Sequence, residues 1–338
     1  MRKPLFFDST LRDGSHAVKQ NLTEKQIRDY CKAIDGCGNY VCMIGHGNGL
    51  GASSIQMGLS KLDEIDMLKI AGEELKKTSL GAFITVGFGT IKSQVIPAIE
   101  AGAKIFCVAC HCTEADTTKP HISYLASREI ESYGVLMMYH MASKEKLLEE
   151  ARKVESYGAK GIILMDSAGT STLEQVREVV KYISSNLNIT VGFHSHNNFG
   201  MAVALSYVAY QSGADIVDGT LRGFGSGAGN CQLEALAALF EKEGIETGVN
   251  LNKILEISEK IVQPMWEYKT PVNDISIVSG YAGVVSTVKH KVLKIAQEYH
   301  VSGRDIFLEL GKRNVIAGED DVILEVAEKL KRKKLFYK

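Results

Sequence analysis

Short apolar runs alternate with amphipathic stretches over roughly the first three quarters of the chain. Glycine or polar residues bound each run, which is typical of strands. The stretches between the runs carry apolar residues at helical spacing, as in Glu24–Ile34 and Leu173–Ser184. The pattern therefore predicts strands that alternate with helices. The predicted strands are Leu5–Phe7, Tyr40–Ile44, Leu80–Val86, Ile105–Ala109, Val135–Met138, Gly161–Met165, Ile189–Phe193 and Ile216–Asp218.

These strands are nearly continuous in apolar residues, which indicates parallel strands that are buried on both faces. Eight such strands, each followed by a helix, fit a closed barrel. The alternative, an open doubly wound sheet, usually carries a glycine-rich dinucleotide-binding turn after its first strand, and no such turn follows Leu5–Phe7. We therefore expect an α/β fold built as a (β/α)8 TIM barrel.

The alternation stops near residue 247. Helical patterns such as Ala282–Tyr299 and Asp320–Arg332 follow, with no further strand between them. We therefore expect two domains, a catalytic TIM barrel over residues 1–247 and a C-terminal helical appendage over residues 248–338.

The composition limits the classes of partner. The 338 residues carry a formal net charge of −1, which gives no global attraction to nucleic acid or to a membrane surface. No run approaches the roughly 18 apolar residues of a membrane span, and the basic start lacks the apolar stretch of a signal peptide. The seven cysteines are scattered, which suits reduced thiols. We expect a cytoplasmic protein with a small-molecule substrate.

His194 and His196 stand two residues apart at the end of the run Ile189–Phe193. In a strand such residues point to the same face, so the two rings either share a divalent cation or form a hydrogen-bonded pair. Asp13 follows the first strand and is either a third ligand or a helix N-cap. The loops after the strands form the catalytic face of a barrel, on which the first and seventh strands are near neighbours. The pattern favours a metal site that suits Mn²⁺, Mg²⁺, Co²⁺ or Zn²⁺.

Three further polar residues fall on the same predicted face. Arg12 is either a fixed cation for the oxyanion of a chelated 2-oxo acid or part of a structural ion pair. His16 is a candidate general base, or it only orients its loop. Ser167 follows the sixth strand and is either a donor to bound substrate or a helix N-cap. Together with the metal site, these residues point to a metalloenzyme.

Two further motifs, one rich in cysteine and one rich in glycine, resemble binding sites, but we infer neither a thiolate metal site nor a nucleotide site from them. Cys107-Val-Ala-Cys110-His-Cys112 imitates a thiolate metal site, but Cys107 and Cys110 would point to opposite sides of a strand, so we expect core thiols. The glycine-rich segment Gly223–Asn230 offers backbone N–H groups to a phosphate. Its spacing matches neither a P-loop nor a dinucleotide fingerprint, so we infer no nucleotide.

Six motifs occur together over nearly the whole chain. They are Asp8-Ser-Thr-Leu-Arg-Asp-Gly-Ser-His16, Phe193-His-Ser-His-Asn-Asn198 with Gly200-Met201, Asp218-Gly-Thr-Leu-Arg-Gly223 with Gly227-Ala-Gly-Asn230, Gly280-Tyr-Ala-Gly283, His111-Cys-Thr-Glu-Ala-Asp116, and Arg304-Asp-Ile with Glu309-Leu-Gly311. With these motifs the chain resembles the 4-hydroxy-2-oxovalerate aldolases, a family of the pyruvate-metallolyase superfamily that also holds isopropylmalate synthase and hydroxymethylglutaryl-CoA lyase. Ser15-His16 and the C-terminal motifs favour the aldolases within that superfamily.

The resemblance implies a carbon–carbon lyase that cleaves 4-hydroxy-2-oxopentanoate to pyruvate and acetaldehyde by class II, metal-dependent chemistry, with Mn²⁺ as the expected ion. Asp13, His194 and His196 would hold the metal, Arg12 would stabilise the pyruvate enolate, and His16 would accept the proton of the C4 hydroxyl.

The resemblance also concerns the appendage and the partners. It places Tyr281 near the substrate. The expected substrate-binding residues are therefore Arg12, Ser167, His194 and Tyr281. It implies an oligomer, either of this chain alone or with an acylating acetaldehyde dehydrogenase that receives the aldehyde. It also implies a place in the catabolism of aromatic hydrocarbons.

Three positions depart from the family pattern. Met43 and Asn48 stand where the family has carboxylates, and Tyr139 stands where a small polar residue is expected before His140. These changes leave the proposed ligands intact but bear on which aldehyde is released. Two other functions stay open: a Claisen-type acyl-CoA condensing enzyme or lyase of the same superfamily, and a non-catalytic barrel that keeps its metal site as a binding subunit.

Overall fold

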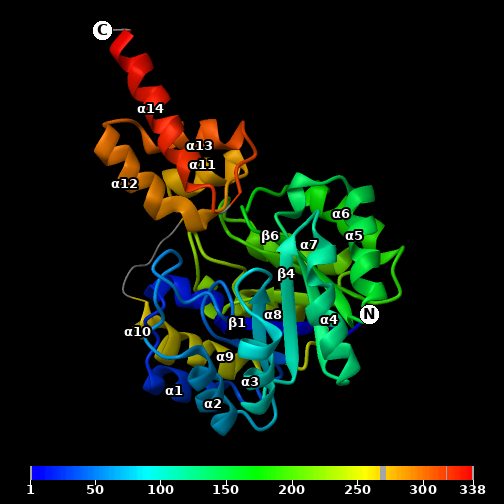
Figure 1. The fold of residues 1–338 in the computed structure, drawn as a ribbon. Coiled ribbons are helices and arrows are strands. Elements are labelled where there is room, and N and C mark those ends of the chain that lie inside the picture. Colours follow the sequence, from blue (N-terminus) through cyan, green and yellow to red (C-terminus); the bar gives the residue numbers. More distant parts are fainter. Residues whose placement is uncertain (1, 267–271, 317, 337–338) are drawn as a thin grey trace.

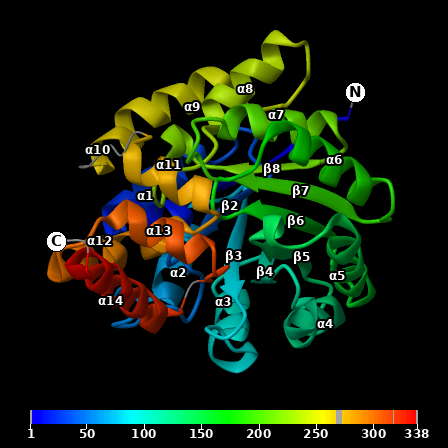
Figure 2. The ribbon, with the colours of Figure 1, turned by 90° about the horizontal axis from the view of Figure 1, so that it is seen from above.

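Eight parallel strands close into a barrel in the computed structural model, which describes residues 2–266, 272–316 and 318–336. Each strand pairs with its neighbours in the chain, and the last strand returns to pair with the first (Figure 2). The predicted (β/α)8 barrel is confirmed. The strands are β1 (Leu5–Leu11), β2 (Val41–Ile44), β3 (Ser79–Thr85), β4 (Ile105–His111), β5 (Glu131–Met137), β6 (Gly161–Asp166), β7 (Thr190–Ser195) and β8 (Ile216–Gly219).

Helices surround the strands, and polar side chains fix where several of them begin. Thr23 and Thr172 form capping boxes with Gln26 and Gln175, so that both partners satisfy backbone N–H groups at the helix start. The apolar stripes of these helices then pack on the barrel. The helices are α1 (Glu24–Ile34), α2 (Glu64–Glu74), α3 (Ile96–Glu100), α4 (Lys119–Ser127), α5 (Lys144–Ser156), α6 (Leu173–Ser184), α7 (Ala202–Gln211) and α8 (Leu233–Lys242).

Alternate strand residues supply two different cores. Phe7, Phe83 and Met165 belong to the cluster that fills the barrel interior, and the opposite strand faces pack against the helices. Cys107 lies in the interior cluster and Cys110 in the outer one, which confirms that these thiols face opposite sides of the sheet. All seven cysteines are buried and free.

The chain after residue 247 contains two parts. The first comprises α9 (Leu251–Ile257) and α10 (Gln263–Met265), and α9 packs against the barrel helices α1 and α8. The second part has a buried core of its own around Phe307 and lies as a separate group beside the barrel (Figure 1). Its helices are α11 (Asp274–Ala282), α12 (Lys289–Tyr299), α13 (Gly303–Gly311) and α14 (Asp320–Phe336). From here on, the appendage means the helices α11–α14 together with the described residues between them, a narrower segment than the predicted residues 248–338.

Polar contacts hold the appendage against the loops that follow the strands. Asn198, in the loop after β7, donates from Nδ2 to the carbonyl oxygen of Ser276 at 3.1 Å and to Oγ of Ser286 at 3.0 Å. His140 Nε2 lies 3.2 Å from the carbonyl oxygen of Gly283. The appendage is therefore attached on the catalytic face of the barrel. Within the described ranges, no helix is both long and apolar enough to cross a membrane.

Candidate metal centre and active site

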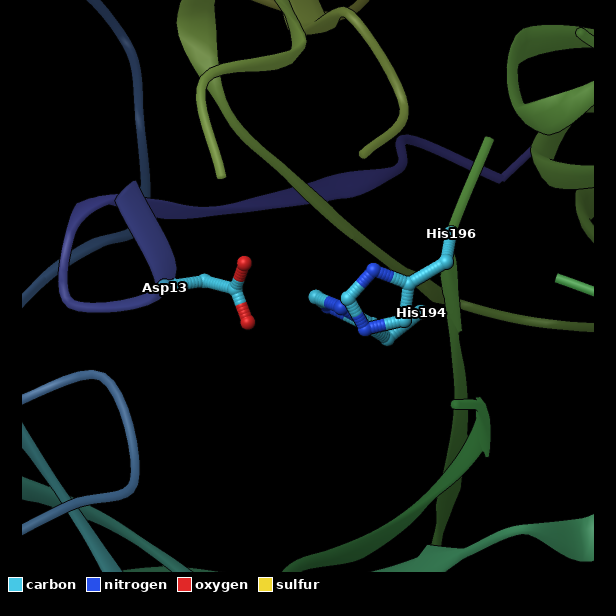
Figure 3. Close-up of side chains that lie close together, drawn as sticks. All are labelled: Asp13, His194 and His196. Atoms are coloured by element: carbon cyan, nitrogen blue, oxygen red, sulfur yellow. The ribbon is translucent and has the colours of Figure 1, made fainter. Parts of the chain in front are cut away.

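Asp13, His194 and His196 meet at the carboxyl end of the barrel. One ligand atom from each lies within 4.8 Å of those of the other two, and all three residues are buried. Asp13 begins the short helix Asp13–Val18 that follows β1, and the two histidines project from the same face at the end of β7 (Figure 3). Closure of the barrel brings β1 and β7 within one strand of each other.

The donor atoms of this cluster fit a divalent cation. Nε2 of His194 and Nδ1 of His196 are buried without a hydrogen-bond partner among the described residues. Burying such an atom without a partner costs about 1–3 kcal/mol of folding free energy, and a bound ion would offset this cost. The two histidines do not hydrogen-bond to each other, which removes that alternative. Two imidazoles and one carboxylate, without a thiolate, suit Mn²⁺, Mg²⁺, Co²⁺ or Zn²⁺.

The electrostatics of the cluster keep Asp13 and His196 in the protonation states that bind a metal. Burial by itself raises the pKa of Asp13, but the neighbouring Arg12, His196, His16 and His194 outweigh burial and hold that pKa well below its usual range. Burial lowers the pKa of His196 to about 4. Near neutral pH the site therefore offers a carboxylate and a neutral imidazole to the ion.

Asp218, at the end of β8, orients the first histidine. Its Oδ2 lies 3.0 Å from Nδ1 of His194, and its Oδ1 accepts a hydrogen bond of 2.8 Å from the hydroxyl of Ser9. A proton held on Nδ1 leaves Nε2 free to bind a metal. Sequence reasoning quoted Asp218 and Ser9 only as parts of motifs and missed this role.

Asn230 supports the carboxylate ligand. Its Nδ2 donates to Oδ1 of Asp13 at 2.7 Å, and the backbone N–H of Ser226 donates to the same oxygen at 3.4 Å. A Cβ on Gly225 would lie 2.1 Å from Nδ2 of Asn230 and 2.5 Å from Oδ1 of Asp13, so this close approach requires glycine. The glycine-rich segment therefore holds a metal ligand, and sequence reasoning missed this use.

Arg12 is a buried cation fixed by several partners. Nη1 lies 3.0 Å from Oδ2 of Asp13, Nη2 donates to Oγ of Ser9 at 3.3 Å, and the guanidinium lies 4.4 Å from the ring centre of Phe83. The ion pair that was the alternative role for Arg12 is thus present. Nε has no hydrogen-bond partner among the described residues, which leaves one donor for a substrate oxygen.

His16 is partly buried beside Arg12. Burial lowers its pKa, which the nearby Asp13 carboxylate partly offsets, so the ring is neutral near pH 7. Its Nδ1 lies 3.1 Å from Nε2 of Gln20, whose Oε1 accepts a hydrogen bond of 3.0 Å from the backbone N–H of Gly47. Because Gly47 fixes the amide, Gln20 donates to Nδ1 and favours the neutral ring with its proton on Nε2.

A cavity of about 390 Å³ connects these residues, and Arg12, Asp13, His16, His196 and Ser167 all line it. Ser167 is not a helix cap, since Thr172 caps α6; its Oγ accepts a hydrogen bond of 3.0 Å from the backbone N–H of Met138. Asp13 does not cap α1 either, because Thr23 does. The appendage lines the cavity too, through Val285, Ser286, Thr287, Ile316 and Gly318.

Tyr281 is the predicted site residue that belongs neither to the metal cluster nor to the cavity lining. Its side chain is 76% exposed and is not among the residues that line the cavity. On α11 the buried positions are Ser276, Ser279 and Gly280, whereas Ile277 and Tyr281, four residues apart, share the outer face. Gly280 makes the close approach to the barrel, which directs the next side chain outward. A role for its phenol stays a prediction.

Comparison with known proteins identifies the family. A family model described as HMGL-like matches residues 3–261, and one described as DmpG-like communication domain matches residues 271–332. The 4-hydroxy-2-oxovalerate aldolase of Pectobacterium atrosepticum is 47% identical over 335 residues, which is 98% of this chain and 97% of the relative. The protein of the same name from Spirochaeta aurantia is 44% identical over 325 residues, with 96% and 95% covered. The chain belongs to the 4-hydroxy-2-oxovalerate aldolase family.

Solved structures of lower identity share the fold of this aldolase-family chain. The carboxyl transferase domain of Rhizobium etli pyruvate carboxylase superposes with a TM-score of 0.82 at 14% identity, covering 98% of this chain and 61% of that one. A structure of the T882A variant of that carboxylase with acetyl coenzyme-A gives a TM-score of 0.84 at 15% identity, with 99% and 32% covered. At these identities the likeness shows the fold alone.

The three departures from the aldolase pattern lie in different places. Met43 is buried in the barrel interior, where Gly81 leaves room for its sulfur. Asn48 lines the cavity as a neutral amide. Tyr139 is buried behind the cavity, with its hydroxyl 2.6 Å from Oγ of Ser171. Of the three positions, only Asn48 therefore lies on the cavity wall itself.

Proposed function

We propose that the chain is a divalent-metal-dependent class II aldolase that cleaves a 4-hydroxy-2-oxo acid, with 4-hydroxy-2-oxopentanoate as the reference substrate, to pyruvate and an aldehyde. The observation that carries the proposal is the buried Asp13, His194 and His196 cluster, with its two orphaned imidazole nitrogens, beside the fixed cation of Arg12. The relatives that share nearly the full chain carry this activity in their names.

Asp13, His194 and His196 would hold the ion, for which we propose Mn²⁺, with Mg²⁺, Co²⁺ and Zn²⁺ compatible with the same ligands. When bound, the ion would supply Lewis-acid polarisation of the keto group of the substrate. Ser167 would donate to the substrate carboxylate, and Nε of Arg12 would donate to the keto oxygen, where negative charge develops.

His16 would take the proton of the C4 hydroxyl. The C3–C4 bond then breaks, its electron pair enters the pyruvate enolate, and the aldehyde leaves; the enolate later gains a proton at C3 to give pyruvate. Because Gln20 favours the ring with its proton on Nε2, Nδ1 must leave Gln20 before the ring can act as a base. Nδ1 then accepts the hydroxyl proton itself, or it takes the ring proton so that Nε2 accepts the hydroxyl proton.

The partner proposal rests on the appendage. Residues 271–332 match the DmpG-like communication domain, which supports an acylating acetaldehyde dehydrogenase as the partner that receives the aldehyde. We place the protein in the cytoplasm, as an oligomer with itself or with that partner.

Metal removal tests the proposed function. Protein treated with a chelator should lose cleavage of racemic 4-hydroxy-2-oxopentanoate, read out as pyruvate, and should regain it with Mn²⁺. His194→Ala should lose both the bound ion and turnover, whereas the exposed His290 offers a matched control, His290→Ala. Full activity after chelation would refute the metal-dependent mechanism. Turnover only with an acyl-CoA would favour a condensing enzyme, and ion binding without turnover would favour a binding subunit.

A further inference from the structure

The cavity has two chemically different walls. The polar wall comes from the ends of β1 and β7, which carry the proposed metal ligands, and from Ser167 after β6. Strands β3 to β6 complete the ring on the other side. The opposite wall and rim are mainly apolar. The apolar residues that line the cavity are Met57, Phe83, Val86, Phe88, Met137, Met138, Met165, Val285 and Ile316.

The polar wall matches one half of a 4-hydroxy-2-oxo acid. In the proposed function, Arg12, Ser167 and the proposed ligands would face the carboxylate and keto oxygens, and His16 would face the C4 hydroxyl. The remaining part of the substrate, the substituent on C4, would contact the apolar wall. In 4-hydroxy-2-oxopentanoate this substituent is a single methyl group, which fills little of a cavity within the range of about 300–1,000 Å³ that holds drug-sized ligands.

Two polar side chains on the apolar side, Thr85 and His111, have partners within the protein. The hydroxyl of Thr85 donates to the carbonyl oxygen of Asn48 at 2.9 Å, and Nδ1 of His111 lies 2.8 Å from Oγ1 of Thr113. Among the described residues that line the cavity, Asp13 is the one carboxylate, and it belongs to the metal cluster. A cationic substituent would therefore find no carboxylate outside the metal cluster to pair with.

The apolar surface continues to the mouth of the cavity. Phe88, from the loop after β3, and Ile316, from the appendage, line the cavity and are each 37% exposed. Met137 and Met165 also line the cavity, and unbranched methionine side chains adapt to chains of different shape. A substituent of several carbons would cover these side chains from water.

We infer that the preferred substrate carries an apolar C4 substituent larger than methyl, an alkyl chain of several carbons or an aryl group, and that the released aldehyde is correspondingly apolar. This inference rests on the proposed aldolase function. Burial of each additional methylene should raise kcat/KM about fourfold, until the wall is filled.

The test compares Mn²⁺-loaded protein on racemic 4-hydroxy-2-oxo acids with methyl, propyl, pentyl and phenyl groups on C4, with pyruvate as the readout. We expect kcat/KM to be at least tenfold higher for propyl than for methyl. Met137→Gln keeps side-chain length but adds an amide, so it should lower the propyl-to-methyl ratio several-fold. Met57→Gln, in a loop, repeats the test if the first variant does not fold. Met201→Gln is the control, because Met201 is partly buried but lies outside the cavity.

The outcomes separate the inference from the function. A propyl-to-methyl ratio near or below one, with methyl substrate cleaved normally, would overturn the apolar subsite and leave the aldolase proposal standing. An equal fall of the ratio in Met201→Gln and in the cavity variants would also overturn it. If no member of the series yields pyruvate while the Mn²⁺ ion is bound, the proposed function fails and the inference falls with it.

Discussion

His16 and Arg12 lie four residues apart but are held by different contacts. We therefore expect their removal to affect the rates of aldol cleavage and of pyruvate enolisation differently. His16→Ala should lower aldol cleavage by about 10²–10⁴-fold, because a general base contributes that much, but should affect enolisation of pyruvate less. Arg12→Ala should damage both reactions, because the enolate oxyanion occurs in each. Exchange of the pyruvate methyl protons measures enolisation. Equal losses in the two assays for His16→Ala would remove its role as the hydroxyl base.

Asp218 gives a second prediction at this scale. Because its carboxylate lies 3.0 Å from Nδ1 of His194, Asp218→Asn should weaken metal binding by about 10–100-fold while the barrel stays folded. Titration with Mn²⁺ measures the affinity directly. Asp29→Asn is a suitable control, since Asp29 pairs with Lys25 on the surface of α1. Unchanged Mn²⁺ affinity in Asp218→Asn would show that the carboxylate does not orient the ligand.

At the scale of elements, Asp35 joins the end of α1 to the start of β3. One of its carboxylate oxygens accepts hydrogen bonds from the backbone N–H groups of Lys76, Lys77 and Thr78, at 3.0, 2.7 and 2.9 Å. Burial raises the pKa of Asp35, but these donors outweigh burial and hold the pKa below its usual value. The folded state is therefore stabilised by the ionised carboxylate.

The sign of the pH dependence follows from this lowered pKa. The stabilisation is complete above the pKa of the unfolded chain, about 3.9, and is lost as the pH falls through the lower pKa of the folded state. Asp35→Asn should lower the free energy of unfolding by about 1 kcal/mol at neutral pH. The difference from the unsubstituted protein should shrink in acid. Denaturant unfolding at a series of pH values measures it, and a difference that grows in acid would contradict the assignment.

At the scale of the whole molecule, Asn198 links the barrel to the appendage. Its two hydrogen bonds reach Ser276 and Ser286, and Ser286 also lines the cavity. Asn198→Ala should therefore speed hydrogen exchange in α11 and lower the rate of cleavage together. Loss of these hydrogen bonds should lower the free energy of opening α11 by about 1–3 kcal/mol. Asn188→Ala, at an exposed loop before β7, is the control. Faster exchange in α11 with unchanged cleavage would show that the appendage does not complete the site.

The barrel and most of its candidate site could be predicted from patterns along the chain. Strand and helix periodicities are local, so alternation along the chain predicted eight strands that close, and the spacing of His194 and His196 predicted a shared face. The position of Asp13 after the first strand then predicted its place on the catalytic face. These features follow from backbone geometry within a few residues, which a linear pattern records.

The contacts that join distant segments could not be predicted in this way, because they depend on the three-dimensional fold. Asp13 and Asn230 are 217 residues apart, and Ser9 and Asp218 are 209 apart, so no local spacing connects them. The outward direction of Tyr281 depends on which face of α11 packs on the barrel. The apolar wall forms only when β3 to β6 and the appendage enclose the same space. Closure of the barrel sets these positions, because it fixes which side chains share a volume.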